Sequence, residues 1–452
     1  MKSRYEVGCQ FDHECIDDEP EQPQGKDGQG KGYELEKKPQ RGIDQPDSDR
    51  RDQRSRGAAY IKARYQPGRN PYRQGGDDPV KQHSEHFSPP DLTIKLAETV
   101  CNHVTVRSSQ HKRRTLEYIV KTVKTRAIMP QLTYLEAIRQ GIWEEMERDP
   151  AVFCLGEDIG IYGGAFKVTD GFIDRFGAER VIDTPIAESA IVGAAFGAAL
   201  TGMRPVAEFQ FMDFIGCAFN QITNMVAKTH YLWGAPSPLV LRGPSGGGVH
   251  GGPFHSQNNE MYFVHTPGLK VVCPATAYDA KGLIKASIRD NNPVIFFEHK
   301  YLYRRIKEDV PAEDYIVPLG KGRVARPGRD LSIITYAAMV HVAVEAAELL
   351  SKEGIDVEIV DLRTLAPLDH EAIVQTVKKT NKVILLHEDV RTGGIAGELA
   401  AIINEEAFDD LDGPIVRITA LDTPVPFSPP QEEYFLPKVS DVVREARRLK
   451  AY

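Results

Sequence analysis

Residues 181–200 read VIDTPIAESAIVGAAFGAAL and combine two patterns that together decide the fold. Val181-Ile182 is a short apolar run of the kind that forms a buried strand. Thr184-Pro185 marks a turn, and the spacing of apolar residues then predicts a helix over residues 187–202. A strand followed directly by a helix is the repeating unit of α/β folds.

The same alternation extends to both sides of this stretch. Thr133 and Glu136 have the spacing of a capping box, so a helix is predicted to begin there and to stop at Asp149-Pro150. Further strands are predicted at 151–155, 205–209, 238–241, 269–272 and 294–297, and further helices at 214–230 and 277–289. Continuous apolar strands that alternate with helices predict a parallel sheet covered by helices on both faces.

A second α/β unit follows a polar, irregular segment. Its strands are predicted at 331–335, 357–360 and 382–386, and its helices at 338–353, 369–379 and 395–405. We therefore place the first domain at 129–310, a linker at 311–327 and the second domain at 328–452. Two domains agree with the length of 452 residues, which is long for one compact core.

Residues 1–128 have a different character, being rich in Gln, Asp, Glu, Arg, Gly and Pro. Such a segment buries too little apolar surface to offset its chain entropy, so we predict a disordered extension. It is too acidic for a typical mitochondrial transit peptide. The alternative is that translation starts at Met129 and that the upstream part does not belong to the natural protein.

The overall composition excludes several classes of function. A net charge of −8 argues against nucleic acid as the main partner, because phosphate binding needs clustered Lys and Arg. No apolar run is long enough to span a membrane, and the N-terminus has no signal peptide. The six cysteines are scattered without a Cys-x-x-Cys pair, which is typical of a reducing compartment. We therefore expect a cytoplasmic protein.

Two acidic residues lie where parallel sheets bind ligands, at the carboxyl ends of strands. Glu157 follows the strand predicted at 151–155, and Glu188 follows Val181-Ile182 in the first turn of the next helix. An acid in the first turn of a helix also complements the helix dipole. On position alone, that structural role is the better explanation for Glu188.

Two further stretches raise functional hypotheses. The helix after Glu188 contains GAAFGAAL at 193–200, and its small side chains favour close contact with another backbone or subunit. The stretch GPSGGGVHGGPFHSQ at 243–257 is a glycine loop that could cradle phosphate, but it lacks the Lys-Ser/Thr of a nucleotide P-loop. Its two histidines, His250 and His255, indicate a catalytic or gating loop; the alternative is a flexible surface loop.

Several motifs occur in a characteristic order: LGED at 155–158, DTPIAE at 183–188, EFQF at 208–211, HSQ at 255–257, PGLKVV at 267–272, AKGL at 280–283 and DLRT at 361–364. From about Leu132 to the C-terminus, the chain resembles the β subunit of the decarboxylating first component of 2-oxo acid dehydrogenase complexes. This resemblance implies a transketolase-like pyrimidine-binding domain followed by a transketolase C-terminal domain.

The resemblance also implies a role for each matching residue. Glu188 would hydrogen-bond N1′ of the aminopyrimidine of thiamine diphosphate, and Glu157 would be a second acid in the same proton network. His255 would face the reaction side and act during acyl transfer to lipoamide. The remaining cofactor-binding positions, which line the pyrimidine pocket, would be Phe214, Ile186 and Gln210. The cofactor itself supplies the electron sink.

The same family implies partners. The chain lacks the Gly-Asp-Gly…Asn motif that binds diphosphate and magnesium, which the α subunit supplies in this family. We therefore expect an α2β2 heterotetramer with a shared active site, a lipoyl acyltransferase partner and a 2-oxo acid substrate. Some relatives also hold a structural potassium ion, and the matching positions here are Leu239, Ser287, Asp290 and Asn292.

Substrate choice stays open between pyruvate and a branched-chain 2-oxo acid. The segments 296–304 and 422–426 resemble the branched-chain type more closely. The alternatives are an acetoin dehydrogenase β subunit, another transketolase-type thiamine enzyme, or a scaffold without catalytic activity. The ordered acids and His255 argue against a scaffold.

Overall fold

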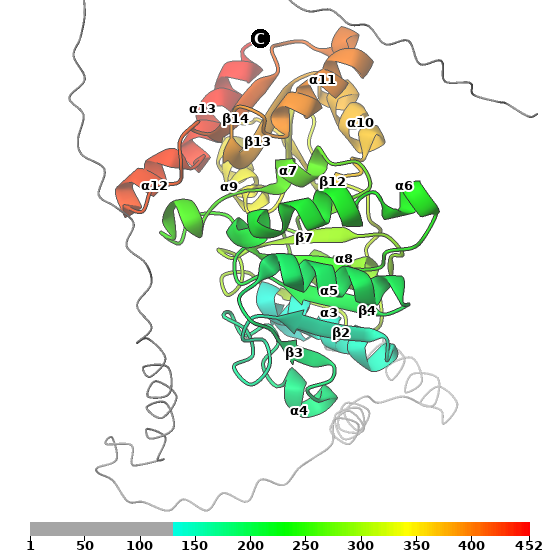
Figure 1. The fold of residues 1–452 in the computed structure, drawn as a ribbon. Helices are drawn as coiled ribbons and strands as arrows, with labels where there is room; N and C mark the ends of the chain where they lie inside the picture. Colours follow the sequence, from blue (N-terminus) through cyan, green and yellow to red (C-terminus); the bar gives the residue numbers. More distant parts are fainter. Residues whose placement is uncertain (1–129) are drawn as a thin grey trace, which may run out of the picture. The chain divides into compact units, whose positions relative to one another are not determined.

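The protein is described by a computed structural model that covers residues 130–452 (Figure 1). The predicted extension at 1–128 and the alternative start at Met129 lie outside the described residues. Among the residues that are described, no helix combines the length and the hydropathy needed to cross a membrane.

Within residues 130–452, the first sheet has seven strands in the order β12-β6-β7-β5-β4-β2-β3. Their bounds are Val152–Gly156 (β2), Val181–Asp183 (β3), Arg204–Glu208 (β4), Val240–Ser245 (β5), Lys270–Val272 (β6), Val294–His299 (β7) and Thr364–Ala366 (β12). All neighbours pair in parallel except β12, which is antiparallel to β6. The strands predicted from the sequence all pair in parallel as expected, and the antiparallel β12 at this edge was not predicted. A crossover helix is what returns a chain in the parallel sense, and β12 instead arrives from the second unit.

Helices cover both faces of the first sheet, as predicted. Val152 and Cys154 pack with α3 (Tyr134–Arg148) and α8 (Ala277–Arg289) in one hydrophobic cluster. Phe153 and Leu155 pack on the opposite face with α5 (Glu188–Leu200), which runs along β4 (Figure 1). Successive side chains of a strand point to opposite faces, so a strand buried on both sides must be apolar throughout.

The predicted capping box at the start of α3 is confirmed. The Thr133 hydroxyl accepts a hydrogen bond from the Glu136 amide at 3.2 Å, and the Thr133 amide donates to Glu136 Oε2 at 2.8 Å. Two amides at the helix start thereby find partners. The preceding residues form β1 (Gln131–Thr133), which pairs antiparallel with β8 (Lys307–Asp309).

The helix predicted at 214–230 is not one α-helix. The chain forms a 3₁₀ segment, η1 (Met212–Ala218), a π segment, η2 (Gln221–Val226), and a short α6 (Thr229–Trp233). The buried residues of η1 are Met212, Ile215 and Ala218, at intervals of three. That interval aligns side chains on one face of a 3₁₀ helix, whereas an α-helix needs 3.6. Packing against the sheet therefore selects the tighter winding.

The second sheet has five strands within the described range, in the order β14-β13-β10-β11-β9. Their bounds are Arg323–Arg326 (β9), Leu331–Thr335 (β10), Val357–Asp361 (β11), Val383–Val390 (β13) and Val416–Ala420 (β14). The helices around it are α9 (Met339–Ser351), α10 (His370–Thr380), α11 (Ala396–Glu406) and α13 (Val439–Lys450). β9 lies inside the segment predicted as a linker and pairs antiparallel with β11. The domain boundary itself stays a prediction.

The two sheets share a hydrophobic core and buried charges. Each of the two large hydrophobic clusters contains residues from both units. Asp279 of α8 is fully buried and lies 2.7 Å from an Arg363 nitrogen and 3.4 Å from an Arg323 nitrogen. These contacts and β12 join the second unit to the first.

Candidate functional site

The predicted catalytic and cofactor-binding residues follow four neighbouring strands in the order β5-β4-β2-β3. Glu157 follows β2, and Glu188 begins α5 after β3. Gln210 and Phe214 follow β4, and His255 lies in the loop after β5. Parallel strands end at the same edge of a sheet, so all these side chains gather at one edge.

Glu157 and Glu188 interact electrostatically. Glu157 is 6% exposed, and its burial, together with the charges of Glu188 and Asp158, raises the pKa of its carboxyl group. The Thr184 amide donates to the Gly156 carbonyl at 2.9 Å, which ties together the turns that carry the two acids. A carboxyl with a raised pKa next to a second acid is suited to hold and pass a proton.

The turn before Glu188 contains one exposed apolar side chain and one buried hydroxyl without a hydrogen-bond partner among residues 130–452. Ile186 is 80% exposed. The Thr184 hydroxyl oxygen is buried and has no hydrogen-bond partner among residues 130–452. Buried polar atoms normally find a partner in the protein, in an ordered water or in a ligand.

Gln210 lies on the other side of β2 from this turn. Its amide nitrogen donates to Asp158 Oδ2 at 3.2 Å. This bond ties the residues after β4 to those after β2. Gln210 therefore lies at the same edge as Glu157, and its role in a pyrimidine pocket stays a prediction.

The ring of His255 packs against two aromatic rings. The centroid of its ring is 5.6 Å from that of Phe214 and 4.5 Å from that of Phe211, both edge to face. The structure thus brings together Phe214 and His255, which lie 41 positions apart in the sequence. Phe211, the extended residue just before η1, was not predicted as a site residue, although it belongs to the EFQF motif at 208–211.

Three amides of the glycine loop after β5 donate to carboxylates of the same chain and are not free for a phosphate. The Gly247 amide donates to Glu388 at 2.5 Å. The amides of Gly248 and His250 each donate to Glu432 at 3.0 Å. These contacts hold three residues of the loop and weaken the hypothesis of a phosphate cradle, while its catalytic role stays a prediction. The loop binds carboxylates of its own chain.

The base of this loop is fixed as well. Gly246 donates from its amide to the Gln257 carbonyl at 3.1 Å. Asp213 Oδ1 accepts from the Gln257 amide at 3.0 Å and from its side chain at 3.1 Å. Sequence reasoning missed Asp213, Glu388 and Glu432, because no local pattern links them to the loop.

A buried ion cluster lies in the strands that carry the site. Arg242, in the middle of β5, is 1% exposed and makes paired contacts with Glu298, one of them at 2.6 Å, and a further contact with Glu208. The Tyr303 hydroxyl donates to Glu298 at 2.6 Å. Burial raises the pKa of Glu208, and the Arg242 guanidinium opposes that shift. The cluster joins β4, β5 and β7 and was not predicted.

The four residues matched to a potassium site lie at the opposite, amino-terminal edge of the strands. Leu239 precedes β5, while Ser287, Asp290 and Asn292 belong to the end of α8 and the segment before β7. The Asp290 carbonyl already accepts a hydrogen bond from Arg204 at 2.9 Å. The structure therefore separates these four residues from the other predicted site residues.

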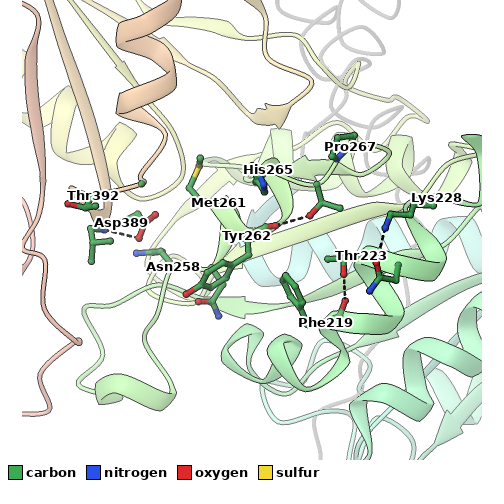
Figure 2. Close-up of a pocket in the computed structure, with 15 residues that line it drawn as sticks. Phe219, Thr223, Lys228, Asn258, Met261, Tyr262, His265, Pro267, Asp389 and Thr392 are labelled. Carbon is green, nitrogen blue, oxygen red and sulfur yellow. Dashed lines mark hydrogen bonds between the residues drawn. The ribbon is translucent and has the colours of Figure 1, made fainter. Parts of the chain in front are cut away.

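A cavity of about 560 Å³ lies elsewhere, and Figure 2 shows it. It is lined by residues of η2, of α7 (Glu260–Val264) and of the turn after β13, with Phe219 and Tyr262 on one side and Asp389 on another. None of the residues that line it is a predicted site residue. The open edge with Glu157 and Glu188 is thus a separate feature.

Comparisons with known proteins identify the two domains and the family of the chain. Residues 130–305 match the family described as transketolase, pyrimidine binding domain, and residues 320–442 match transketolase, C-terminal domain. The chain is 51% identical to the 2-oxoisovalerate dehydrogenase subunit beta of Bacillus subtilis over 329 residues, which is 72% of this chain and 100% of that protein. It is 45% identical to the pyruvate dehydrogenase E1 component subunit beta of the same organism, over 71% of this chain and 99% of that one.

The chain belongs to the family of 2-oxo acid dehydrogenase β subunits. A solved structure titled "Split gene transketolase, inactive beta4 tetramer" aligns with a TM-score of 0.59 at 24% identity, covering 71% of this chain and 98% of that chain. That likeness concerns the fold alone. The two family matches confirm the predicted pair of transketolase-like domains. In this family, a pyrimidine-binding domain implies thiamine diphosphate as the cofactor.

Proposed function

We propose that this chain is the β subunit of a thiamine-diphosphate-dependent 2-oxo acid dehydrogenase. With an α subunit it would catalyse oxidative decarboxylation of a 2-oxo acid and transfer of the acyl group to lipoamide. The observation that carries this proposal is the coupled pair Glu157 and Glu188 at the carboxyl ends of β2 and β3, in a chain of this family. We propose the cytoplasm as the location.

The residues at this edge suit the pyrimidine half of the cofactor. Glu188 would accept a hydrogen bond from the ring, and Glu157, with its raised pKa, would share the proton. The Thr184 hydroxyl, without a partner among residues 130–452, and the exposed Ile186 provide one polar and one apolar contact. Phe214 would pack on the ring, and Gln210 would line the pocket. When bound, the cofactor supplies the electron sink for decarboxylation.

The other half of the cofactor requires a second chain. Three amides of the glycine loop donate to Glu388 and Glu432, so these three donors are not free for a diphosphate. We propose that an α subunit binds the diphosphate and magnesium, in an α2β2 heterotetramer. The names of both relatives cited above contain "subunit beta", which supports a partner chain.

Helix α5 is the surface we propose for the α subunit. Side chains built at Gly193 and Gly197 would meet no described atom within 4 Å, so this face of the helix is open. Exposed glycines in a helix destabilise it by about 1 kcal/mol each relative to alanine. A close backbone contact with a partner would offset that cost. Ile186, just before α5, would extend the same surface.

His255 would act after decarboxylation, when the acyl group passes to lipoamide. Its ring packs edge to face against Phe211 and Phe214, which follow β4 at the edge that carries the two acids, and this packing supports the proposal. The lipoyl acyltransferase component would deliver the acceptor. For the substrate we propose a branched-chain 2-oxo acid, because the relative named for 2-oxoisovalerate shares 51% identity against 45% for the one named for pyruvate.

Potassium binding at Leu239, Ser287, Asp290 and Asn292 is a separate proposal. It is supported by the buried Ser237 hydroxyl, which has no partner in the described part of the chain and precedes Leu239 by two residues. The nearby charges of Arg204 and Lys270 oppose it. A higher thermal midpoint in potassium than in sodium chloride at equal ionic strength would support the proposal, and equal midpoints would refute it.

The test is co-expression with the α subunit, followed by assays with 3-methyl-2-oxobutanoate, pyruvate and acetoin. We expect decarboxylation of the branched-chain acid at the highest kcat/KM. The variant Glu188→Gln keeps the shape but loses the charge, and we expect it to assemble normally and to lose at least about 100-fold in rate. Normal turnover by this variant would refute the mechanism. Activity of the β chain alone with thiamine diphosphate and magnesium would refute the shared site.

A further inference from the structure

The loop that carries His255 is held from the second sheet, which the proposed function does not explain. Two carboxylates reach it from distant parts of the sequence. Glu388 belongs to β13, and Glu432 belongs to α12 (Pro429–Phe435). We refer to Glu388 and Glu432 together as the carboxylate clamp.

Glu388 contacts both ends of the loop. It accepts hydrogen bonds from the Gly247 amide at 2.5 Å and from the side chain of Asn258 at 3.2 Å. Its other oxygen lies 2.9 Å from His299 Nε2. Burial alone would raise the pKa of Glu388, but His299 and these hydrogen bonds bring it down to about 2. The carboxylate is therefore charged at neutral pH and binds the loop through charge-assisted bonds.

Glu432 contacts the middle of the loop. Its Oε1 accepts from the Gly248 amide at 3.0 Å. Its Oε2 accepts from the His250 amide at 3.0 Å and lies 2.6 Å from the Nδ1 of the same residue. The backbone of His250 has a φ of 61°, which is unfavourable for a residue with a side chain. The contacts with Glu432 supply the energy that holds this conformation.

Packing leaves the loop little freedom. A Cβ at Gly246 would collide with the ring of His299 in β7. A Cβ at Gly252 would collide with the ring of Phe427, which, like Glu388 and Glu432, comes from the second unit. Both glycines have positive φ, at 79° and 68°. Only glycine fits at both places.

We propose that Glu388 and Glu432 are positioning residues, through which the C-terminal domain sets the place of His255 for acyl transfer. The proposal rests on the role proposed for His255. Neither glutamate contacts His255 directly; they act through the backbone between residues 247 and 258. Decarboxylation depends on Glu188 and Glu157, which lie on other turns of the same edge, so the clamp should affect only the second half of the reaction.

The test uses the reconstituted complex and the variant Glu432→Gln. Gln places an NH₂ group where Oε2 accepted from His250, so two donors face each other and the loop shifts. Two rates are measured: decarboxylation with an artificial electron acceptor, and acylation of free lipoamide. Since a displacement of about 1 Å can lower a rate roughly 100-fold, we expect acylation to fall about 10- to 100-fold, with decarboxylation within about twofold of wild type.

The matched control is Glu433→Gln, which changes the adjacent residue, whose side chain is 77% exposed. We expect both of its rates to equal those of wild type. A second variant, Glu432→Asp, keeps the charge and shortens the side chain, and we expect a smaller loss of acylation with decarboxylation retained. This variant decides the question if Glu432→Gln does not assemble.

Further outcomes separate this proposal from the proposed function. If His255→Ala does not slow acylation, the role proposed for His255 fails. If His255→Ala slows acylation but Glu432→Gln does not, the clamp proposal is overturned. Equal losses in both rates for Glu432→Gln would also overturn it, because they would indicate a general structural role. Because the clamp acts through His255, the double variant with His255→Ala and Glu432→Gln should be no slower in acylation than His255→Ala alone.

Discussion

His387 shows how a single residue acquires its properties from its surroundings. It lies in β13, is 1% exposed, and its ring nitrogens have no hydrogen-bond partner of good geometry among residues 130–452. Burial lowers its pKa from 6.5 to about 4. The folded protein therefore keeps His387 neutral at a pH where the unfolded chain would be protonated.

This difference predicts a pH-dependent loss of stability. As the pH falls below about 6.5, the unfolded state takes up the proton first, so His387 costs stability between pH 6.5 and 4 and has no such effect above that window. The variant His387→Leu should escape this cost. We expect its free energy of unfolding, relative to wild type, to rise by about 2 kcal/mol between pH 7.5 and 5.

Urea unfolding of the full-length chain at several pH values measures this difference. Asp361 and Asp389, whose pKa values burial raises to about 6, have the opposite pH dependence, but they are present in both proteins. The control is Gln375→Leu, at an exposed position of α10, which changes no titratable group and should keep the pH dependence of wild type. Parallel curves for His387→Leu and wild type would contradict the prediction.

At the scale of elements, α5 combines a buried and an open face. Ile191, Val192, Ala195, Phe196 and Ala199 pack on the sheet, which holds the helix in place despite its two glycines. The opposite face exposes Ala194, Gly197 and Leu200. Tertiary packing thus holds in place a helix that contains two glycines, and its open face leaves room for the proposed partner.

A large side chain on the open face should block assembly and leave the fold intact. A Cβ at Gly197 would meet no described atom within 4 Å, and the position is exposed, so we expect Gly197→Trp to fold. We expect the variant to be soluble, with a thermal midpoint close to that of wild type, and to lose co-purification with the α subunit. Size-exclusion chromatography of the co-expressed subunits measures this, with Asn404→Trp, at an exposed position of α11, as the control. Normal assembly of Gly197→Trp would remove α5 from the proposed interface.

At the scale of the whole molecule, a buried ion pair links the two units. Asp279 is fully buried, and the side chain of Arg363 is 11% exposed and lies 2.7 Å from it. Thr276 donates to Asp279 at 2.9 Å as well. Removal of one partner from a buried ion pair leaves the other charge without compensation, which costs more than the pair itself contributes.

We therefore expect Asp279→Asn to destabilise the full-length chain by about 3 kcal/mol. The control is Glu353→Gln, which removes an exposed ion pair with Arg447 at 2.6 Å and should leave the unfolding midpoint unchanged. Thermal and urea unfolding measure both. Equal midpoints for Asp279→Asn and wild type would show that the buried pair does not hold the two units together.

The sequence alone determined what depends on short-range pattern. Apolar runs alternating with helical spacing predicted the α/β class, every strand of the first sheet except β12, and three of the five strands of the second sheet, β10, β11 and β13; Thr133 with Glu136 predicted the start of α3. The acids at 157 and 188 could be placed at strand ends for the same reason. Their roles came only from the ordered motifs, because position alone favoured a structural explanation for Glu188.

Only the tertiary structure decided features that join distant segments. β12 has three residues and no pattern of its own, and it forms because the edge of β6 is free to accept it. The split of 214–230 into η1, η2 and α6 follows from packing against the sheet. Glu388 lies 141 residues from the Gly247 amide that it binds, and Glu432 lies 184 residues from that of Gly248. A local period carries no information about such contacts, since they depend on how the two sheets meet.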